Sequence, residues 1–245
     1  MSYPYFFVDP GCVRENLIRI QGEDLNHLKN VLRTRVGDVV HVSDNEHFRY
    51  RTEVLSIGRS EIELSVKEKK QMVPDSPAIV LFQCILKKNS MEFVIQKSTE
   101  IGAGTIVPVT SERVVSDVKD VSGRVERWQK ISDGASKQCK RDFKCEIALP
   151  VNIGDIDVSE YDYFFVPYEK SPGYDKSMVE NRRAMADSSK IAFLIGPEGG
   201  FSDDEVNSLA RRGAIEVKLG KNIYRSETAA IYFLSVLDYL IGNRK

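Results

Sequence analysis

From residue 78 onward, short apolar runs alternate with longer stretches in which apolar residues recur every three to four positions. The short runs have the length of buried strands, and the longer stretches have the periodicity of helices with one apolar face. We predict strands at 78–86, 104–109, 145–149, 163–167, 190–195 and 215–219. We predict helices at 90–101, 124–139, 175–186, 203–212 and 226–241. This alternation is typical of an α/β fold, a mainly parallel sheet with helices on both faces.

The first part of the chain has a different pattern, in which apolar and polar residues alternate with a period of two. Strands are predicted at 3–8, 39–42, 48–56 and 61–67, with a short helix at 23–32. Two prolines and several polar residues between 69 and 77 interrupt both periodicities and indicate a linker. We therefore predict two domains, a small β-rich one at 1–72 and an α/β one at 73–245.

A predicted buried strand runs into a glycine-rich loop, Gly196-Pro-Glu-Gly-Gly200, which leads into a helix. Glycine lets the backbone take positive φ or approach a ligand closely, and Pro197 restricts its neighbours. Ser202 and Glu205 have the spacing of a capping box. Three carboxylates at 203–205 would repel a phosphate from this helix N-terminus, so we expect a neutral or cationic ligand held by backbone groups. The glycine spacing also matches neither the dinucleotide-binding motif nor the P-loop.

A second loop, 220–225, separates the strand at 215–219 from the C-terminal helix. Ser226 is a natural N-cap for this helix, and Gly242 is a natural C-terminal stop. The helix is apolar on nearly every side, so we expect it to be buried all round, within the domain or against a second copy of the chain. With sixteen residues that include two acids, it is too short and too charged to span a membrane.

Four blocks of sequence follow one another along the chain. They are His27-Leu-Lys-Asn-Val-Leu-Arg-Thr-Arg-Val-Gly-Asp38, Gln96-Lys-Ser-Thr-Glu-Ile-Gly102, Leu194-Ile-Gly-Pro-Glu-Gly-Gly200, and Leu219-Gly to Arg225-Ser-Glu-Thr228. The blocks resemble the SPOUT superfamily of RNA methyltransferases, and within it the RsmE family, whose members methylate ring nitrogen N3 of a uridine in 16S ribosomal RNA. The resemblance implies a knotted, SPOUT-type α/β domain preceded by a PUA-like β-barrel that helps to hold RNA. It also implies that the last two blocks lie side by side in a trefoil knot and bind S-adenosyl-L-methionine.

The resemblance assigns cofactor contacts to these two loops, several of them through backbone groups. The residues are Leu194, Ile195, Gly196, Gly199, Gly200, Leu219, Gly220, Ile223, Arg225, Ser226 and Thr228. Some positions depart from the family pattern. Lys221-Asn222 stand where relatives carry Pro-Arg, Tyr224 where they carry leucine, and Ser226 where they carry threonine. Lys221 and Tyr224 can alter how the second loop closes, whereas Ser226 keeps a capping hydroxyl.

Two side chains near the loops are candidates for catalysis. The imide N3 of a uridine must lose its proton around the time it attacks the methyl group, and negative charge then spreads onto the neighbouring carbonyl oxygens. Arg225 is a candidate to hold the substrate or stabilise that charge, and the alternative is an ion pair with Glu227 or Glu198. Glu198 is a candidate general base, and the alternative is that it caps backbone amides of its own loop.

Basic residues concentrate between 124 and 144, where seven Lys or Arg face three acids. On the predicted helix they would form a phosphate-facing surface around Trp128, and the alternative is a solvated helix face. The resemblance adds two arginines of the first block and two residues near the substrate mouth. The RNA-binding candidates are Arg33, Arg35, Arg124, Arg127, Lys137, Gln138 and Arg141.

The composition sets outer limits on this interpretation. With 245 residues, 42% of them hydrophobic, and a net charge of −1, the chain is typical of globular proteins and has no global signature of nucleic-acid binding. Its three histidines all precede residue 48, so the predicted α/β domain has none for a zinc centre or a catalytic triad. The four scattered cysteines indicate reduced thiols. We expect no bound metal, no membrane segment and a cytoplasmic location.

Two other functions stay open on sequence grounds. One is a different SPOUT activity, such as ribose 2′-O-methylation or methylation of another base, and the other is a non-catalytic RNA-binding protein. The intact Gly-Pro-Glu-Gly-Gly loop and Arg225 argue against the second. As partners we expect 16S ribosomal RNA or the small ribosomal subunit, and a second copy of the chain in a homodimer through the helix at 226–241.

Overall fold

The computed structural model describes residues 3–114, 121–171 and 177–242. It divides into two compact units, Met1–Pro74 with Lys137–Lys144, and Asp75–Ser136 with Cys145–Lys245. The sequence pattern predicted a single boundary after residue 72, and it did not indicate that the segment 137–144 groups with the first unit. Each unit has a hydrophobic core of its own.

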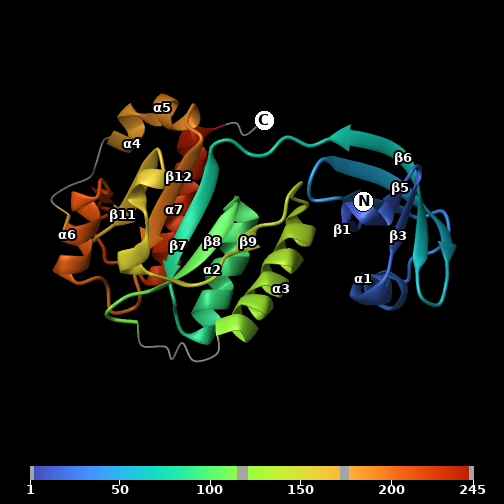
Figure 1. Cartoon of the computed structure of the whole chain (residues 1–245), viewed down its shortest axis with the longest axis horizontal. Helices are drawn as coiled ribbons and strands as arrows, with labels where there is room; N and C mark the ends of the chain where they lie inside the picture. Colours follow the sequence, from blue (N-terminus) through green and yellow to red (C-terminus); the bar gives the residue numbers. More distant parts are fainter. Residues whose placement is uncertain (1–2, 115–120, 172–176, 243–245) are drawn as a thin grey trace. The chain divides into compact units, whose positions relative to one another are not determined.

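In the described part of the first unit, six strands form one sheet (Figure 1). In spatial order they are β1 (Tyr5–Phe7), β4 (Val39–Ser43), β5 (Phe48–Ile57), β6 (Ile62–Gln71), β3 (Leu17–Ile20) and β2 (Val13–Arg14). Strand β1 pairs parallel with β4, and all other neighbours pair antiparallel. The alternating apolar residues of these strands face a core that also contains Leu28. A short 3-10 turn (Pro10–Cys12), helix α1 (Gly22–Asn26) and one π-helical turn (His27–Val31) complete the unit.

Two expectations for this unit were wrong. Strands β2 and β3 were not predicted, because runs of two and four residues are too short to establish a period of two. Residues 69–71 were assigned to the linker, but they extend β6 and pair with residues 48–50 of β5. Their polar side chains lie on the exposed end of a long hairpin, where alternation is lost although the backbone pairing continues.

The described strands of the second unit form a parallel sheet. Its strands in spatial order are β10 (Val151–Asn152), β8 (Thr105–Thr110), β7 (Ala78–Cys84), β12 (Lys190–Ile195), β11 (Tyr163–Pro167) and β13 (Ile215–Val217), and β9 (Glu146–Ile147) pairs with β8 beside this path. Strand β12 therefore lies between β7 and β11, and β13 lies beyond β11 at the edge. The knot implied by the resemblance stays a prediction, because strand order and register do not record how the chain passes through its own loops.

Helices cover both faces of this sheet (Figure 1). One face packs against α2 (Lys88–Ile101), α3 (Val121–Cys139), α4 (Ser177–Glu180), α5 (Arg182–Ala186) and α7 (Ser226–Ile241). The other face packs against α6 (Asp203–Arg211) and two 3-10 turns (Ile153–Asp155 and Val158–Glu160). Successive residues of β7 point to opposite cores, Leu81 to the first and Phe82 to the second. The predicted α/β architecture is confirmed.

The C-terminal helix begins and ends where the sequence pattern placed it, but it is not buried all round. One side, with Ala230, Phe233, Leu234 and Leu237, belongs to the core. The opposite side leaves Tyr239 84% exposed, so the helix is not buried all round within its own domain, and burial against a second copy stays a prediction. The predicted helix at 175–186 is two short helices, and residues 175 and 176 lie outside the described residues. In the described part of the chain, no helix has the length and apolar character needed to cross a bilayer.

Candidate active site

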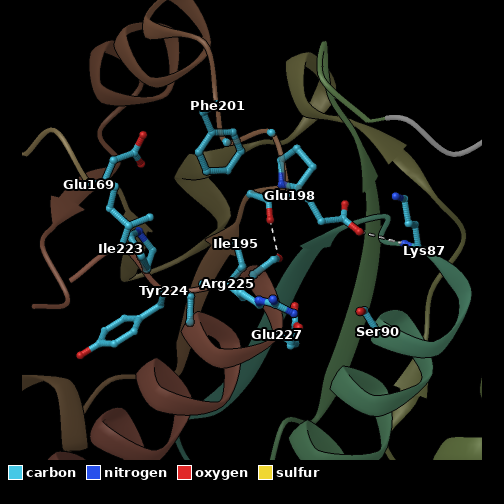
Figure 2. Close-up of a pocket in the computed structure, with 17 residues that line it drawn as sticks. Lys87, Ser90, Glu169, Ile195, Glu198, Phe201, Ile223, Tyr224, Arg225 and Glu227 are labelled. Carbon is cyan, nitrogen blue, oxygen red and sulfur yellow. Dashed lines mark hydrogen bonds between the residues drawn. The ribbon is translucent and has the colours of Figure 1, made fainter.

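Two loops of the second unit meet at the carboxyl edge of the parallel sheet. The loop after β12 begins at Gly196, and the loop after β13 ends at Arg225, where α7 begins. The Ser226 hydroxyl, on the first residue of α7, donates a hydrogen bond of 2.5 Å to the Gly196 carbonyl oxygen (Figure 2). In open α/β sheets, ligands bind at this edge, where loops from neighbouring strands diverge.

The meeting loops enclose two adjoining cavities. The first has a volume of about 600 Å³, and the second of about 320 Å³. The two cavities share Pro167, Glu169, Ile223, Tyr224 and Ala229 in their walls. Their combined space is in the range of sites for small molecules and cofactors.

Most of the cofactor candidates named from the sequence line these cavities. Ile195, Gly196, Gly199, Gly200, Ile223, Arg225 and Ser226 line the first cavity. Leu219, Gly220 and Ile223 line the second. Leu194 is fully buried in the core, Thr228 is exposed on α7, and neither contributes to the wall of either cavity.

Three glycines of the two loops have either little space for a side chain or an unusual backbone conformation. Gly200 has φ +67°, a conformation that is costly for residues with a Cβ. A Cβ on Gly196 would lie 3.1 Å from the Phe201 ring. A Cβ on Gly220 would lie 2.9 Å from the hydroxyl oxygen of Tyr224. Backbone without a side chain therefore lines the cavities at these positions.

The first loop is fixed by contacts at both ends. The predicted capping box is confirmed, since the Glu205 amide donates to the Ser202 hydroxyl at 3.3 Å and the Ser202 amide donates to the Glu205 carboxylate at 2.9 Å. The Arg113 guanidinium donates to the carbonyl oxygens of Gly199 and Phe201, each at 3.2 Å. Arg113 thus holds the loop from the end of β8, a role that sequence spacing alone did not assign.

The first turn of α6 keeps its negative charge. Lys170 donates to the Asp203 carboxylate at 2.6 Å, and Tyr168 also donates to it. These two hydrogen bonds hold the pKa of Asp203 below its usual range, so the carboxylate is ionised at neutral pH. The expectation of a neutral or cationic ligand rests on such ionised carboxylates at the helix N-terminus, and Lys170 offsets part of that charge.

The two catalytic candidates have different surroundings. Arg225 is exposed, occupies the N-cap position of α7 and faces the first cavity (Figure 2). Among the described residues, it forms no ion pair with Glu227 or Glu198, the alternative considered from the sequence. The Glu198 carboxylate accepts the backbone N–H of Lys87 at 3.3 Å. Glu198 therefore links the first loop to the start of α2, instead of capping its own loop.

Ser226 does not have the role that its position indicated. The N-cap of α7 is Arg225, which makes no side-chain capping bond, and Ser226 is the first residue of the helix. Its hydroxyl is directed inward, towards Gly196. A Ser or Thr at a helix start is predicted to be a cap because capping joins residues that are close in the sequence. The partner of Ser226 is thirty residues away, so the sequence pattern does not reveal it.

Sequence reasoning missed several residues of the cavity wall. Lys87 and Ser90 come from the start of α2, and Glu169 follows β11. Glu169 was detectable in principle, because it follows the carboxyl end of a predicted parallel strand. The buried Cys84 of β7 is no candidate nucleophile, since burial raises the pKa of its thiol to about 12. The described residues contain no group of three or more His, Cys, Asp or Glu arranged to hold a metal ion, and the four cysteines, all of them described, form no disulfide.

The RNA-binding candidates are divided between the two units. Arg33 and Arg35 lie exposed in the first unit, which also contains Lys137, Gln138 and Arg141. Arg124 and Arg127 belong to α3 in the second unit. Lys137 pairs with Asp24 at 2.6 Å, and Arg127 pairs with Glu92 at 2.7 Å.

Trp128 contradicts the expected surface on this helix. It is only 5% exposed and packs in the core of the second unit, so the basic residues of α3 do not surround an aromatic platform. An amphipathic helix turns its one large aromatic residue to the core, where its burial contributes most.

Comparisons with known proteins agree with this architecture. The RNA methyltransferase domain family matches residues 74–238, and the RNA methyltransferase PUA domain family matches residues 20–67. The ribosomal RNA small subunit methyltransferase E of Mesomycoplasma hyopneumoniae is 31% identical over 94% of this chain and 96% of its own length. That of Buchnera aphidicola from Acyrthosiphon pisum is 27% identical over 99% of this chain and 95% of its own length.

Solved structures extend the likeness to the fold. A putative methyltransferase of Legionella pneumophila, in complex with the cofactor SAM, is 26% identical with a TM-score of 0.86 and covers 98% of each chain. A ribosomal RNA small subunit methyltransferase E of Neisseria gonorrhoeae shares the fold, with a TM-score of 0.86 over 98% of each chain. The matched domains define a class, RNA methyltransferases with an N-terminal PUA-like domain. Within that class, the chain belongs to the ribosomal RNA small subunit methyltransferase E family.

Proposed function

We propose that this chain transfers a methyl group from S-adenosyl-L-methionine to ring nitrogen N3 of a uridine in 16S ribosomal RNA. One observation supports it above the others. The two glycine-containing loops, which are separate in the sequence, meet in one cavity with Arg225 at its edge. The relatives' names support the substrate class, and the SAM complex of the Legionella relative supports the cofactor.

The cavity residues fit this cofactor in shape and charge. S-adenosylmethionine carries a sulfonium, an ammonium and a carboxylate group, and the first cavity offers both signs of charge, with Glu169, Glu198 and Glu227 beside Lys87 and Arg225. The absence of a Cβ at Gly196 and Gly220 lets the loop backbones pack closely against the Phe201 and Tyr224 rings beside the cavity. The cofactor supplies an activated methyl group, so neither a metal nor a covalent enzyme intermediate is needed.

In the proposed mechanism, the protein mainly orients the reactants and stabilises charge. The loop backbones hold the cofactor side of the cavity, and the exposed Arg225 guanidinium faces the open side, where a nucleobase enters. There it stabilises the negative charge that develops on the uracil carbonyl oxygens as N3 loses its proton. Glu198 already accepts the Lys87 amide, which favours a positioning role for this carboxylate over that of a general base.

Nucleoside mass spectrometry tests this proposal. Ribosomal RNA from cells that lack the protein should contain no 3-methyluridine, and re-expression of the chain should restore it. Re-expression of an Arg225→Ala variant should fail to restore it at the same protein level. Loss of a 2′-O-methylated nucleoside, with 3-methyluridine unchanged, would instead establish the alternative SPOUT activity. Absence of any cofactor binding in calorimetry would leave only the RNA-binding function.

We also propose how the rest of the molecule contributes. Residues 1–72 would help to hold RNA, and residues 73–245 would carry the chemistry, with a homodimer formed through α7. Tyr232 and Tyr239 support the dimer, because these exposed aromatic residues are seven positions apart on one helix face. The substrate, ribosomal RNA or an assembling small subunit, places the protein in the cytoplasm.

A further inference from the structure

A fully buried glutamine lies directly behind the junction of the two loops. Gln83 is near the end of β7, and in the sheet it is paired with Ile195, the residue before Gly196. Its side-chain Nε2 donates to the Ser226 hydroxyl at 3.0 Å and to the Cys84 carbonyl oxygen at 3.0 Å. Gln83 does not line either cavity, so any effect it has on a ligand must pass through another residue.

Gln83, Ser226 and Gly196 form a short chain of hydrogen bonds, here called the relay, in which each donor and acceptor is fixed. With the amide reversed, Gln83 Oε1 would face the Cys84 carbonyl oxygen, and two acceptors would meet; the amide nitrogen must therefore point this way. Because Ser226 Oγ accepts from this nitrogen, its single proton is left for the Gly196 carbonyl, at 2.5 Å. The relay runs from amide to hydroxyl to carbonyl, and it joins β7, α7 and the first loop.

The buried Gln83 amide lowers the stability of the fold, and the hydrogen bonds of the relay alone do not explain why an amide is present. Gln83 Oε1 is buried, and it has no hydrogen-bond partner among the described residues. A buried polar atom without a partner destabilises the folded chain, and an apolar side chain of similar size would avoid that cost. A role of the amide donor in ordering the cofactor site would explain why Gln83 occupies this position.

We propose that Gln83 is a positioning residue of the cofactor site, a statement that rests on the proposed function. By directing the Ser226 proton to Gly196, it sets the separation of the two loops whose backbones line the cavity. Without the amide donor, the hydroxyl rotates among several orientations, and the Gly196 carbonyl loses its fixed partner. The first loop then samples wider positions, and the cofactor must bear the cost of ordering it.

A double-mutant cycle with calorimetry tests the relay. The variants are Gln83→Met, which is similar in size and has no donor, Ser226→Ala, and the two combined. Each single variant should weaken S-adenosylmethionine binding about tenfold, the order expected when one buried hydrogen bond is lost. Because both changes break one relay, the double variant should bind no more weakly than Ser226→Ala alone.

Thr52→Val is the matched control for a merely structural effect. Thr52 makes the same kind of buried bond, from its hydroxyl to the Val40 carbonyl at 2.7 Å, within the first unit. Thr52→Val should lower the melting temperature, because a buried hydrogen bond is lost, while the dissociation constant of the cofactor stays within twofold. Either of two results would refute the relay. One is an unchanged cofactor dissociation constant in Gln83→Met. The other is a double variant in which the two single effects on that constant multiply.

Hydrogen exchange tests the relay in protein without cofactor, so its outcome does not depend on the proposed function. In protein without ligand, Gln83→Met should speed amide exchange at residues 198–201 and leave the amides of β5 unchanged. If the unmodified protein fails to bind S-adenosylmethionine, the proposed function is wrong, but the exchange result still decides whether the relay orders the loop. Equal exchange in both proteins would refute it.

Discussion

At the scale of single residues, Arg225 carries the chemical part of the proposal. It occupies the N-cap position of α7 without making a capping bond, although Ser, Thr, Asp and Asn are preferred there. Its guanidinium is exposed at the edge of the first cavity. A residue that contributes little to its own helix and faces a ligand cavity is better explained by the ligand than by the fold.

Substitution of Arg225 should affect turnover far more than stability. Arg225→Gln is expected to lower kcat roughly a hundredfold, because the group that stabilises developing negative charge is lost. The melting temperature should stay unchanged, since Arg225 forms no ion pair with the neighbouring glutamates. Single-turnover methylation of 16S ribosomal RNA measures the first effect, and thermal unfolding measures the second. A change confined to the KM for RNA would instead assign Arg225 to substrate binding.

Asp44 gives the first unit a dependence on pH. Burial alone would raise the pKa of Asp44, but the amides of Phe48, His47 and Glu46 donate to its carboxylate and hold that pKa below its ordinary value of 3.8. A carboxyl group whose pKa is lower in the folded chain stabilises the fold at pH values above the unfolded pKa. That contribution is lost as the pH falls through the folded pKa.

Asp44→Asn should therefore destabilise the protein by about 1–2 kcal/mol at pH 7, because charge-assisted hydrogen bonds become neutral ones. The difference from the unmodified protein should shrink as the pH falls below 3.8. Urea unfolding followed at several pH values provides the measurement. A difference that grows towards acid pH would contradict this account of Asp44.

At the scale of elements, the two ligand loops are held in different ways. The first is fixed by the capping box of α6 and by Arg113, whereas the second depends on the packing of Tyr224. The ring of Tyr224 lies 5.4 Å from that of Tyr232 on α7, and its hydroxyl lies close to Gly220.

Gly220→Ala should weaken cofactor binding about tenfold, because the new methyl group would lie 2.9 Å from the Tyr224 hydroxyl and displace the loop. The second change Tyr224→Leu should restore most of the affinity by removing that hydroxyl. Gly134→Ala in α3 is the matched control, since nothing lies within 4 Å of the added Cβ and the helix should gain stability. Calorimetry measures the dissociation constant of the cofactor in the three variants. If Tyr224→Leu fails to restore binding, a clash with the Tyr224 hydroxyl is not the cause of the loss.

At the scale of the whole molecule, the second unit exposes aromatic side chains on α7 and on the neighbouring helix α2. Tyr239 is 84% exposed, Tyr232 is 43% exposed, and Phe93 of the neighbouring helix α2 is 46% exposed. Exposed aromatic residues on packed, rigid helices are typical of protein interfaces. A dimer contact on the exposed side of α7 would account for the apolar residues there, because only the opposite side of the helix meets the core of its own chain.

Tyr239→Asp should convert the proposed dimer into a monomer, because it places a charge within the apolar contact. Light scattering at micromolar concentration should report twice the chain mass for the unmodified protein and one chain mass for the variant. Leu149→Asp is the control, since Leu149 is 71% exposed in a loop away from α7 and should leave the dimer intact. A monomeric unmodified protein would refute the dimer outright.

The sequence by itself determined the alternation of strands and helices in the second unit, the bounds of β11, β12 and α7, and the capping box at Ser202. These features depend on neighbours a few positions apart, which periodicity and capping rules describe. The family resemblance added the pairing of the two loops. Only the tertiary structure decided that Ser226 bonds to Gly196, that Trp128 faces the core, and that residues 137–144 group with the first unit. Each of these contacts joins positions far apart in the chain, and a local pattern contains no information about which distant partner will satisfy a buried polar group or cover an apolar face.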